Sequence, residues 1–192
     1  PNVKVITNPE TIKISNVNVF FMPYGEDKKF IREKLKEFSE IASNSDSKSL
    51  LVGHLGINGA ELMGTKAEGE FNAGDFYPDI FDFIYMGHYH KRQYINNRKD
   101  FIYGGSTIQN TFSDAGQEKG YDILSFNGNT VYDKFITSSS PKFFTFSHYD
   151  DTVKKEIDKG NFVRINAPEE EVKKISLSED DESELSQATE NA

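Results

Sequence analysis

Hydrophobic and polar residues alternate in short segments near the start of the chain, and hydrophobic residues then recur at helical spacing. The β-rich segments are Val3–Ile6, Thr11–Ile14 and Val17–Met22. Between Glu26 and Ser43, apolar side chains return every three or four positions (Ile31, Leu35, Phe38 and Ile41). This spacing predicts one amphipathic helix.

Short apolar runs separated by turn residues follow, which is the pattern of further strands. The predicted strands are Leu50–Val52, Phe83–Met86, Gln93–Ile95, Phe101–Tyr103, Tyr121–Phe126 and Thr130–Ile136. Asn127-Gly128 favours a tight turn, so the last two strands are predicted to form a hairpin. A long glycine-rich loop spans residues 53–74, and long irregular connections of this kind are usually functional or mobile. The pattern as a whole predicts an α/β fold.

The net charge of −9 is concentrated at the end of the 192-residue chain. Residues 168–192 carry nine acidic side chains against two lysines, which leaves the first 167 residues nearly balanced. The average therefore does not exclude a nucleic-acid partner. Residues 178–192 are predicted to be a disordered acidic tail. The absence of cysteine excludes disulfides and thiolate metal sites and indicates a reducing compartment. No apolar stretch reaches the ~18 residues of a membrane span, so no membrane association is expected.

Three of the four histidines follow the same local pattern, in which an apolar run and a glycine precede the histidine. His54 ends Ser49-Leu-Leu-Val-Gly-His54, and His88 and His90 lie in Gly87-His-Tyr-His90. Side chains two positions apart on an extended backbone point to the same side, and neutral imidazole binds divalent Mn, Fe, Zn, Ni or Co. These three histidines are candidate metal ligands. Surface or capping histidines are the alternative, and His148 is interpreted as an ordinary polar residue.

Other candidates lie close to these histidines in sequence. Lys91 and Arg92 follow His90 directly and are candidates for contacting a DNA phosphate, with plain solvated charges as an equal alternative. Gly105 and Ser106 follow a strand and could bring backbone amides to a phosphate, with a tight turn as the alternative. The carboxylates considered as further ligands, by proximity in sequence, are Asp75, Asp79, Asp82 and Asp114, although exposed loop acids are the simpler interpretation of each.

The order of these motifs resembles that of the calcineurin-like metallophosphoesterases. Pro23-Tyr24, Gly53-His54 and Gly87-His-Tyr-His90 are followed by Gly104-Gly-Ser106, then Phe112-Ser-Asp114 and Gln117-Glu-Lys-Gly120. The closing signature is most similar to that of SbcD-type nuclease subunits, including the recombination endonuclease subunits of T-even phages. The family's usual Gly-Ser-Pro is Gly105-Ser-Thr107 here.

The resemblance implies two divalent metal ions, most simply Mn. It assigns His54 and His88 to one ion and His90 to the other. The family's remaining metal motifs, Asp-x-His, Gly-Asp-x-x-Asp and Gly-Asn-His-Asp, would all lie upstream of Pro1. The chain is therefore expected to be the carboxyl-terminal part of a longer protein and to be inactive alone. The residue that acts on the transition state is left unassigned, since its motif is absent from this chain.

The same resemblance gives an expected organisation. Residues 1–137 form the carboxyl-terminal half of a metallophosphoesterase β-sandwich flanked by helices, 138–142 a linker, and 143–177 the start of a small α/β capping domain. The implied activity is two-metal hydrolysis of DNA phosphodiester bonds in recombination, repair or replication. The implied partners are DNA, an SbcC-like coiled-coil ATPase and a second copy of the chain, in the cytoplasm of a bacterial or phage-infected cell.

Two other function classes fit the sequence. One is a non-catalytic module that keeps the fold and binds DNA or an ATPase. The other is a general phosphodiesterase that acts on small nucleotides.

Overall fold

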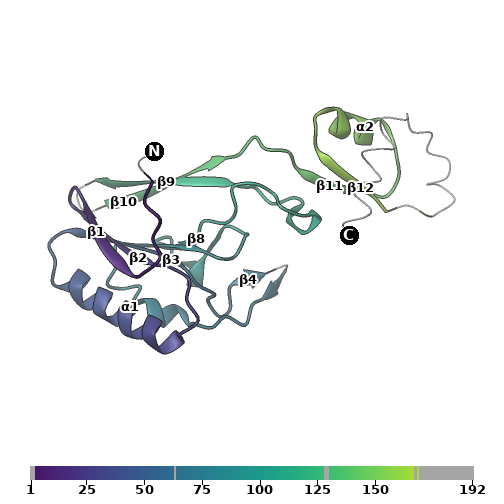
Figure 1. Ribbon diagram of the computed structural model, residues 1–192. Coiled ribbons are helices and arrows are strands. Elements are labelled where there is room, and N and C mark those ends of the chain that lie inside the picture. Colours follow the sequence, from purple (N-terminus) through teal and green to yellow (C-terminus); the bar gives the residue numbers. More distant parts are fainter. Residues whose placement is uncertain (1–2, 63, 128–129, 167, 169–192) are drawn as a thin grey trace. The chain divides into compact units, whose positions relative to one another are not determined.

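The computed structural model describes residues 3–62, 64–127, 130–166 and 168, and the chain divides into two compact units. The first unit comprises Pro1–Ser140 and contains the large sheet, and the second comprises Pro141–Ala192. Figure 1 shows the elements of both units. The predicted acidic tail at 178–192 lies outside the described residues.

A six-stranded sheet in the order β1-β2-β3-β6-β8-β7 is the centre of the first unit. β2, β3, β6 and β8 run parallel, whereas β1 and β7 are antiparallel edge strands. The strands are β1 (Glu10–Ile14), β2 (Val17–Met22), β3 (Lys48–His54), β6 (Phe83–Gly87), β7 (Gln93–Tyr94) and β8 (Phe101–Tyr103). Parallel strands with a covering helix confirm the predicted α/β fold, which is compatible with part of a metallophosphoesterase-like domain.

Helix α1 (Lys28–Ser43) covers one face of this sheet. It begins two residues later than the sequence suggests, because the Asp27 side chain accepts hydrogen bonds from the backbone N–H groups of Lys29 and Phe30 and so caps the first turn. The helix buries Ile31, Leu35 and Phe38 as predicted, whereas Ile41 is 44% exposed. The three buried side chains of the helix belong to the same hydrophobic core as Phe20, Leu51 and Met86 of the sheet. Burial of that apolar face is what stabilises the helix.

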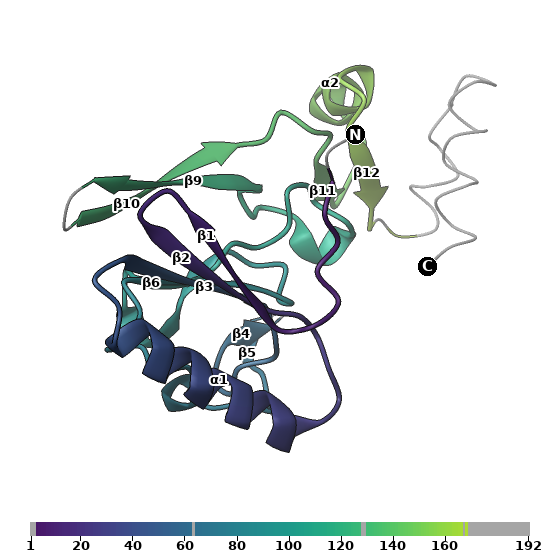
Figure 2. The ribbon, with the colours of Figure 1, turned by 60° about the vertical axis from the view of Figure 1, so that its left-hand side comes forward.

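The hairpin of β9 (Gly120–Asn127) and β10 (Thr130–Thr137) lies on the opposite side of the sheet from α1 (Figures 1 and 2). Polar side chains link it to the sheet. The Tyr85 hydroxyl donates to Asp122 at 3.2 Å, and Arg92 pairs with both Asp122 and Asp133 at 2.7 Å. The predicted hairpin is therefore confirmed, with Asn127 and Thr130 paired at its end.

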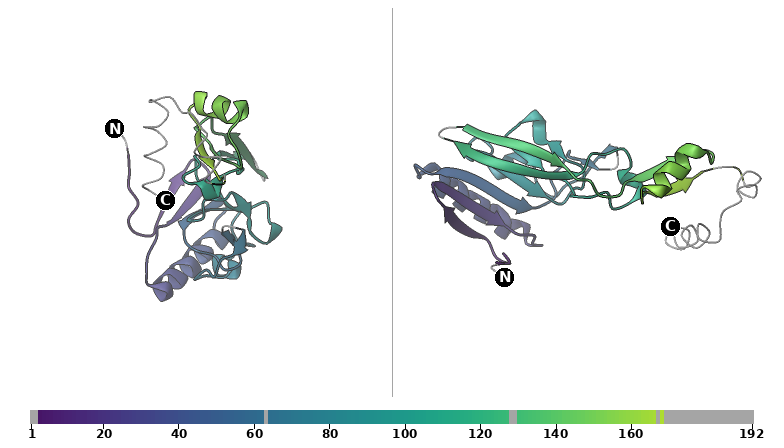
Figure 3. Two further views of the ribbon diagram at one scale, coloured as in Figure 1. Left: turned by 90° about the vertical axis from the view of Figure 1, so that its right-hand side faces the viewer. Right: turned by 90° about the horizontal axis from the view of Figure 1, so that it is seen from above.

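The second unit contains a small parallel β-α-β element. β11 (Phe143–Phe146) pairs in parallel with β12 (Phe162–Ile165), and α2 (Asp151–Asp158) connects them and packs on β12 (Figure 3). Asp150 caps α2 by accepting from the backbone N–H groups of Thr152 and Val153. Phe143 and Phe162 stack across the strand pair, with ring centroids 4.6 Å apart.

The glycine-rich loop has more local structure than the sequence indicated. It contains the two-stranded β4–β5 element (Glu61–Leu62 and Thr65–Lys66) and the 3-10 turn η1 (Ala73–Phe76). Phe71 and Phe76 are fully buried beneath it, as their apolar character suggests. Two further 3-10 turns are η2 (Ile95–Asn97) and η3 (Phe112–Asp114).

The prediction of a strand at Val3–Ile6 is wrong. These residues are irregular, and Val3 and Val5 are 78% and 76% exposed. Alternation alone does not form a strand where no neighbouring strand supplies hydrogen bonds. Within the part of the chain that the structure describes, no helix has the length and hydropathy of a membrane span.

Candidate metal centre

His54 and His88 come together at the carboxyl ends of two adjacent parallel strands. His54 is the last residue of β3, and its register partner is Gly87, the last residue of β6. The two imidazole rings are 5.5 Å apart between centroids and nearly perpendicular. Open α/β sheets usually place ligand sites at this edge. The sheet therefore brings together two of the three histidines selected from the sequence.

Gly87 leaves room for the His54 ring in its observed orientation. A Cβ atom at position 87 would lie 2.8 Å from Nδ1 of His54, closer than real Cβ contacts allow. The next residue, His88, has a backbone φ of 114°, a conformation that side-chain-bearing residues rarely adopt. Strain of this kind persists only when the surrounding structure enforces it, and it is common at functional sites.

Tyr103 fixes the loop that follows His54. Its buried hydroxyl donates to the carbonyl oxygen of Leu55 at 2.6 Å and accepts from the N–H of Ile57 at 2.9 Å. Its ring packs edge-on against Tyr89, which in turn contacts the ring of His88. Burial raises the pKa of Tyr103 well above its ordinary value, so the hydroxyl stays protonated and keeps its donor. One buried side chain thus connects the surroundings of both histidines.

The electrostatics favour a neutral imidazole at His88. Partial burial is the main cause that lowers its pKa, and the charges of His54 and His90 act in the same direction. Glu70 opposes this shift. Neutral imidazole is the form that binds metal ions, so the local field favours a ligand role at neutral pH. The contribution from His90 also places that third histidine within electrostatic reach.

His90 is held mainly through its main-chain carbonyl oxygen. This oxygen accepts hydrogen bonds from the backbone N–H of Ser106 at 3.0 Å and from the ammonium of Lys119 at 2.7 Å. Its exposed ring has Nδ1 3.4 Å from the side-chain nitrogen of Asn110. The position of His90 therefore depends on residues well downstream in the chain.

Lys119 and Asp114 form a buried ion pair behind His90. Their charged atoms are 2.9 Å apart, and their side chains are only 3% and 7% exposed. Burial alone would raise the pKa of Asp114, but the N–H of Asn110 and the Lys119 ammonium together hold that pKa below its usual value. Asp114 also caps the η3 turn, where its carboxylate accepts from the N–H groups of Asn110 and Thr111.

Lys91 and Arg92, predicted to contact phosphate, both have protein partners. Lys91 pairs with Glu61 of β4. Arg92 binds Asp122 through two nitrogens, and its guanidinium lies 4.9 Å from the ring centroid of Phe135. Burial alone would lower the pKa of Arg92, but the hydrogen bonds to Asp122 raise it above its ordinary value. These contacts give Arg92 a clear role in attaching the β9–β10 hairpin, and phosphate contact stays a prediction for both residues.

Gly105 and Ser106, also predicted to contact phosphate, lie against the backbone of residues 90–92. Gly105 has a φ of 76°, and a Cβ there would be 2.8 Å from the nitrogen of Arg92 and 2.9 Å from the carbonyl oxygen of His90. The turn therefore needs glycine, because only glycine allows this approach. The hydroxyl of Ser106 donates to the carbonyl oxygen of Ile108 at 2.7 Å. Their binding to a phosphate stays a prediction.

The four carboxylates considered as further ligands are each paired within the protein. Asp75 lies near Arg32, Asp79 binds Arg98, Asp82 binds Lys48 and Asp114 binds Lys119. Across residues 3–62, 64–127, 130–166 and 168, no three His, Asp or Glu side chains form a metal-binding group. Among the described residues, His54 and His88 therefore have no third side chain grouped with them as a metal ligand, although the charge of Glu70 acts on His88.

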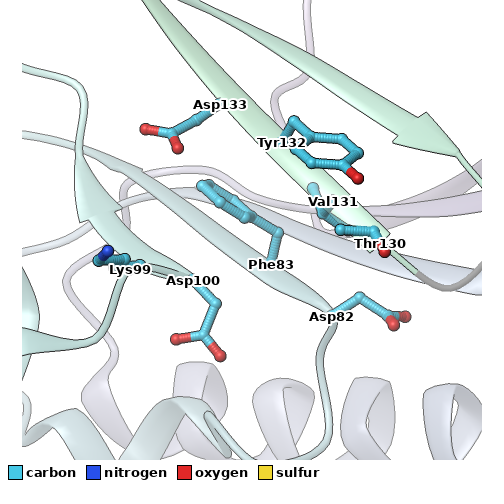
Figure 4. Close-up of a pocket in the computed structure, with 8 residues that line it drawn as sticks. All are labelled: Asp82, Phe83, Lys99, Asp100, Thr130, Val131, Tyr132 and Asp133. Atoms are coloured by element: carbon cyan, nitrogen blue, oxygen red, sulfur yellow. The ribbon is translucent and has the colours of Figure 1, made fainter.

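A cavity of about 380 Å³ lies at the opposite end of the sheet, between the sheet and the β9–β10 hairpin. Figure 4 shows its lining, which includes Asp82, Phe83 and Asp100 from the amino ends of β6 and β8 and Thr130 and Tyr132 from β10. Its acids are paired with Lys48, Arg98 and Arg92. This cavity therefore does not include the three candidate histidines.

The residues that sequence reasoning missed are Tyr103, Asn110 and Lys119. Lys119 belongs to the Gln117-Glu-Lys-Gly120 motif that carried the family resemblance, and this was the available signal. Its burial could not be read from the sequence, because lysine is almost never buried unless it is paired. Tyr103 resembles any other apolar strand residue.

Comparison with known proteins gives a similarity that agrees with these motifs. The chain is 28% identical, over 152 aligned positions, to the SbcD subunit of the SbcCD nuclease of Staphylococcus epidermidis. The alignment covers 69% of this chain and 40% of the relative, so the chain corresponds to less than half of that protein's length. No protein-family model matches the chain. The similarity points to an SbcD-like nuclease relation and leaves mechanism and metals unassigned.

Proposed function

We propose that this chain forms part of a metal-dependent DNA nuclease subunit of the SbcD type. The observation that carries the proposal is the convergence of His54 and His88 at the carboxyl ends of β3 and β6. It occurs in a chain with sequence similarity to an SbcCD nuclease subunit over 69% of its length. Because that relative is much longer, the activity is proposed for a protein that contains this chain and the remaining metal motifs.

The donor chemistry fits part of a divalent-metal site. The facing imidazoles of His54 and His88 suit Mn²⁺ or Zn²⁺, and the pKa of His88 is lowered, which favours its neutral form. The strained backbone of His88 is consistent with a fixed ligand. We assign His54 and His88 to one ion and His90 to a second. Two such ions, when bound, activate a water molecule and neutralise charge on a phosphodiester.

The chain's own residues provide the frame around those ions. Tyr103 holds the loop after His54, and the Gly105–Ser106 turn holds the carbonyl of His90. Lys91 remains about 40% exposed in its pair with Glu61, so it can exchange that partner for a phosphate oxygen. Arg92 is more enclosed, and its contribution is to keep the β9–β10 hairpin against the sheet.

The partners proposed are DNA and an SbcC-like coiled-coil ATPase. The relative's name assigns it to a two-component SbcCD nuclease, and the same arrangement is proposed for the protein that contains this chain. A homodimer is part of the proposal as well.

The test is digestion of linear duplex DNA with Mn²⁺ by this chain joined to a segment that supplies the remaining metal motifs. The proposal expects DNA cleavage that is stimulated by the ATPase and lost on chelation. Faster turnover of a cyclic or dinucleotide substrate would replace it with the general phosphodiesterase. DNA or ATPase binding with no hydrolysis of any of these substrates would replace it with the non-catalytic module.

A further inference from the structure

The ammonium group of Lys119 lies where three hydrogen-bond acceptors converge behind the candidate metal centre. It donates to the carbonyl oxygen of His90 at 2.7 Å, to Oδ1 of Asp114 at 2.9 Å and to Oε1 of Gln117 at 3.0 Å. An ammonium has three donors and no acceptor, so these contacts use it completely. The buried charge is therefore fully satisfied and has a single favoured geometry.

Asp114 fixes the other half of the pair to the backbone. One oxygen binds Lys119, and the other accepts from the N–H of Asn110 at 2.9 Å and the N–H of Thr111 at 3.4 Å. These bonds anchor the carboxylate to the start of η3. Because the carboxylate cannot move independently of this turn, the position of the lysine is set by the main chain.

An apolar pair would fill the same space without the desolvation of two charges, and such replacements are often neutral or stabilising. Stability alone therefore gives a weak reason for an ion pair at this place. What an apolar pair cannot supply is a donor directed at the carbonyl oxygen of His90. That oxygen also accepts from Ser106, so the peptide of His90 is held from two elements.

We propose that Lys119, held in place by Asp114, is a positioning residue for His90. The ring of His90 is exposed, so packing does not set its direction, and the fixed carbonyl determines where the side chain begins. This inference rests on the proposed function, in which His90 is a metal ligand. The closing signature of the sequence then acts by holding the last histidine in register with His54 and His88.

The experiment follows the imidazole ring nitrogen signals in nuclear magnetic resonance spectra of the full chain during titration with Zn²⁺, a diamagnetic ion that shifts most strongly the rings that ligate it. In the wild type, the signals of His54, His88 and His90 should shift at lower Zn²⁺ than the signal of His148. In the double variant Asp114→Asn/Lys119→Met, the Zn²⁺ concentration that shifts His90 should rise about tenfold or more. His54 and His88 should shift as in the wild type.

The matched control is the double variant Asp82→Asn/Lys48→Met, which removes a lysine–aspartate pair at the other end of the sheet. It should leave all three histidines at their wild-type Zn²⁺ response. Equal loss at His90 in both double variants would overturn the inference, because the effect would then be general destabilisation. An unchanged His90 in Asp114→Asn/Lys119→Met would overturn it too.

Lys119→Arg covers the case in which that double variant does not fold. It keeps the positive charge beside Asp114, but the larger planar group cannot replace the single N–H directed at His90. A shift of about threefold confined to His90 supports the inference, and an unchanged response overturns it. If no histidine of the wild type responds before His148, the proposed function itself fails, which is a different result from either.

Discussion

The two ends of the six-stranded sheet each contain a lysine–aspartate pair, and the pairs act on different neighbours. At the amino end, Lys48 and Asp82 are 2.6 Å apart and link β3 to β6, with Ser49 also bonded to the carboxylate. At the carboxyl end, Lys119 and Asp114 are more buried and reach the backbone of His90. The first pair joins two strands, whereas the second holds a loop residue.

The two ends of the sheet also differ in what surrounds these pairs. The amino end has a cavity of about 380 Å³, and its acids are already paired with basic side chains. The carboxyl end has two facing imidazoles, a strained backbone at His88 and a hydroxyl that fixes the loop after His54. We therefore place the candidate site at the carboxyl end because of these chemically active groups, and not because of a cavity.

The largest expected effect tests whether activity belongs to the carboxyl end alone. In the completed protein, His54→Ala, His88→Ala and His90→Ala should each lower the rate of DNA hydrolysis by about 100-fold, because a misplaced ion no longer aligns water and phosphate. Rates on linear duplex DNA with Mn²⁺ give the measurement. Lys99→Ala, in the cavity at the amino end, and His148→Ala should retain the wild-type rate. A comparable loss in Lys99→Ala would break the comparison.

The next effect concerns two arginines near opposite ends of the sheet. Arg92→Ala should lower the free energy of unfolding by about 3–5 kcal/mol, because it leaves the carboxylate of Asp122 buried and unpaired. The Asp122 side chain is 0% exposed in the pair. Urea unfolding of the isolated chain gives the measurement.

Arg98→Ala is the control for that measurement. Arg98 pairs with Asp79, which is 85% exposed, and with Asp100, which is 40% exposed. Pairs of this kind contribute about 0–1 kcal/mol, so this variant should unfold close to the wild type. Equal losses in the two variants would mean that the buried carboxylate is not what distinguishes Arg92.

The fold was largely readable from the sequence because its signals are local. The spacing of Ile31, Leu35 and Phe38 marks the buried face of α1, and Asn127-Gly128 marks the β9–β10 turn. The prediction of a strand at Val3–Ile6 failed because a strand depends on a neighbouring strand, which the sequence of the segment itself does not reveal.

The site was readable only in part. His54 and His88 could be selected because each follows a strand that ends in glycine, and the parallel register of β3 and β6 then brings them together. The roles of Lys119 and Tyr103 depend on contacts across 29 and 48 residues, with His90 and Leu55 respectively. No local pattern contains that information.

A smaller expected effect is the pH dependence of the folding stability that Asp114 and Asp82 contribute. The pKa values of Asp114 and Asp82 are both lowered in the folded chain, so each should stabilise it above the unfolded value of about 3.9 and lose that contribution as pH falls through the lowered pKa. At pH 6, Asp114→Asn should cost about 1.5–3 kcal/mol, the range for hydrogen bonds to charged groups. Asp82→Asn should cost less, since Asp82 is more exposed. Urea midpoints from pH 6 to pH 3 should converge with the wild type, and a constant difference would contradict the assignment.

The smallest expected effect separates backbone strain at His88 from the ordinary backbone of His54. At a φ of 114°, glycine is unstrained whereas alanine is strained by its Cβ, so the His88→Gly variant should be more stable than His88→Ala. The strain destabilises the alanine variant by about 1–3 kcal/mol. The greater freedom of glycine in the unfolded state destabilises the glycine variant by about 0.5–1 kcal/mol, so the glycine variant should be the more stable by about 1 kcal/mol. His54 ends a regular strand, and there the order should reverse, with His54→Gly less stable than His54→Ala by about 0.5–1 kcal/mol. Thermal unfolding of the four variants gives both differences. The same order at both positions would show that His88 carries no strain, and the carboxyl end would then lose one of the features that distinguish it from the amino end.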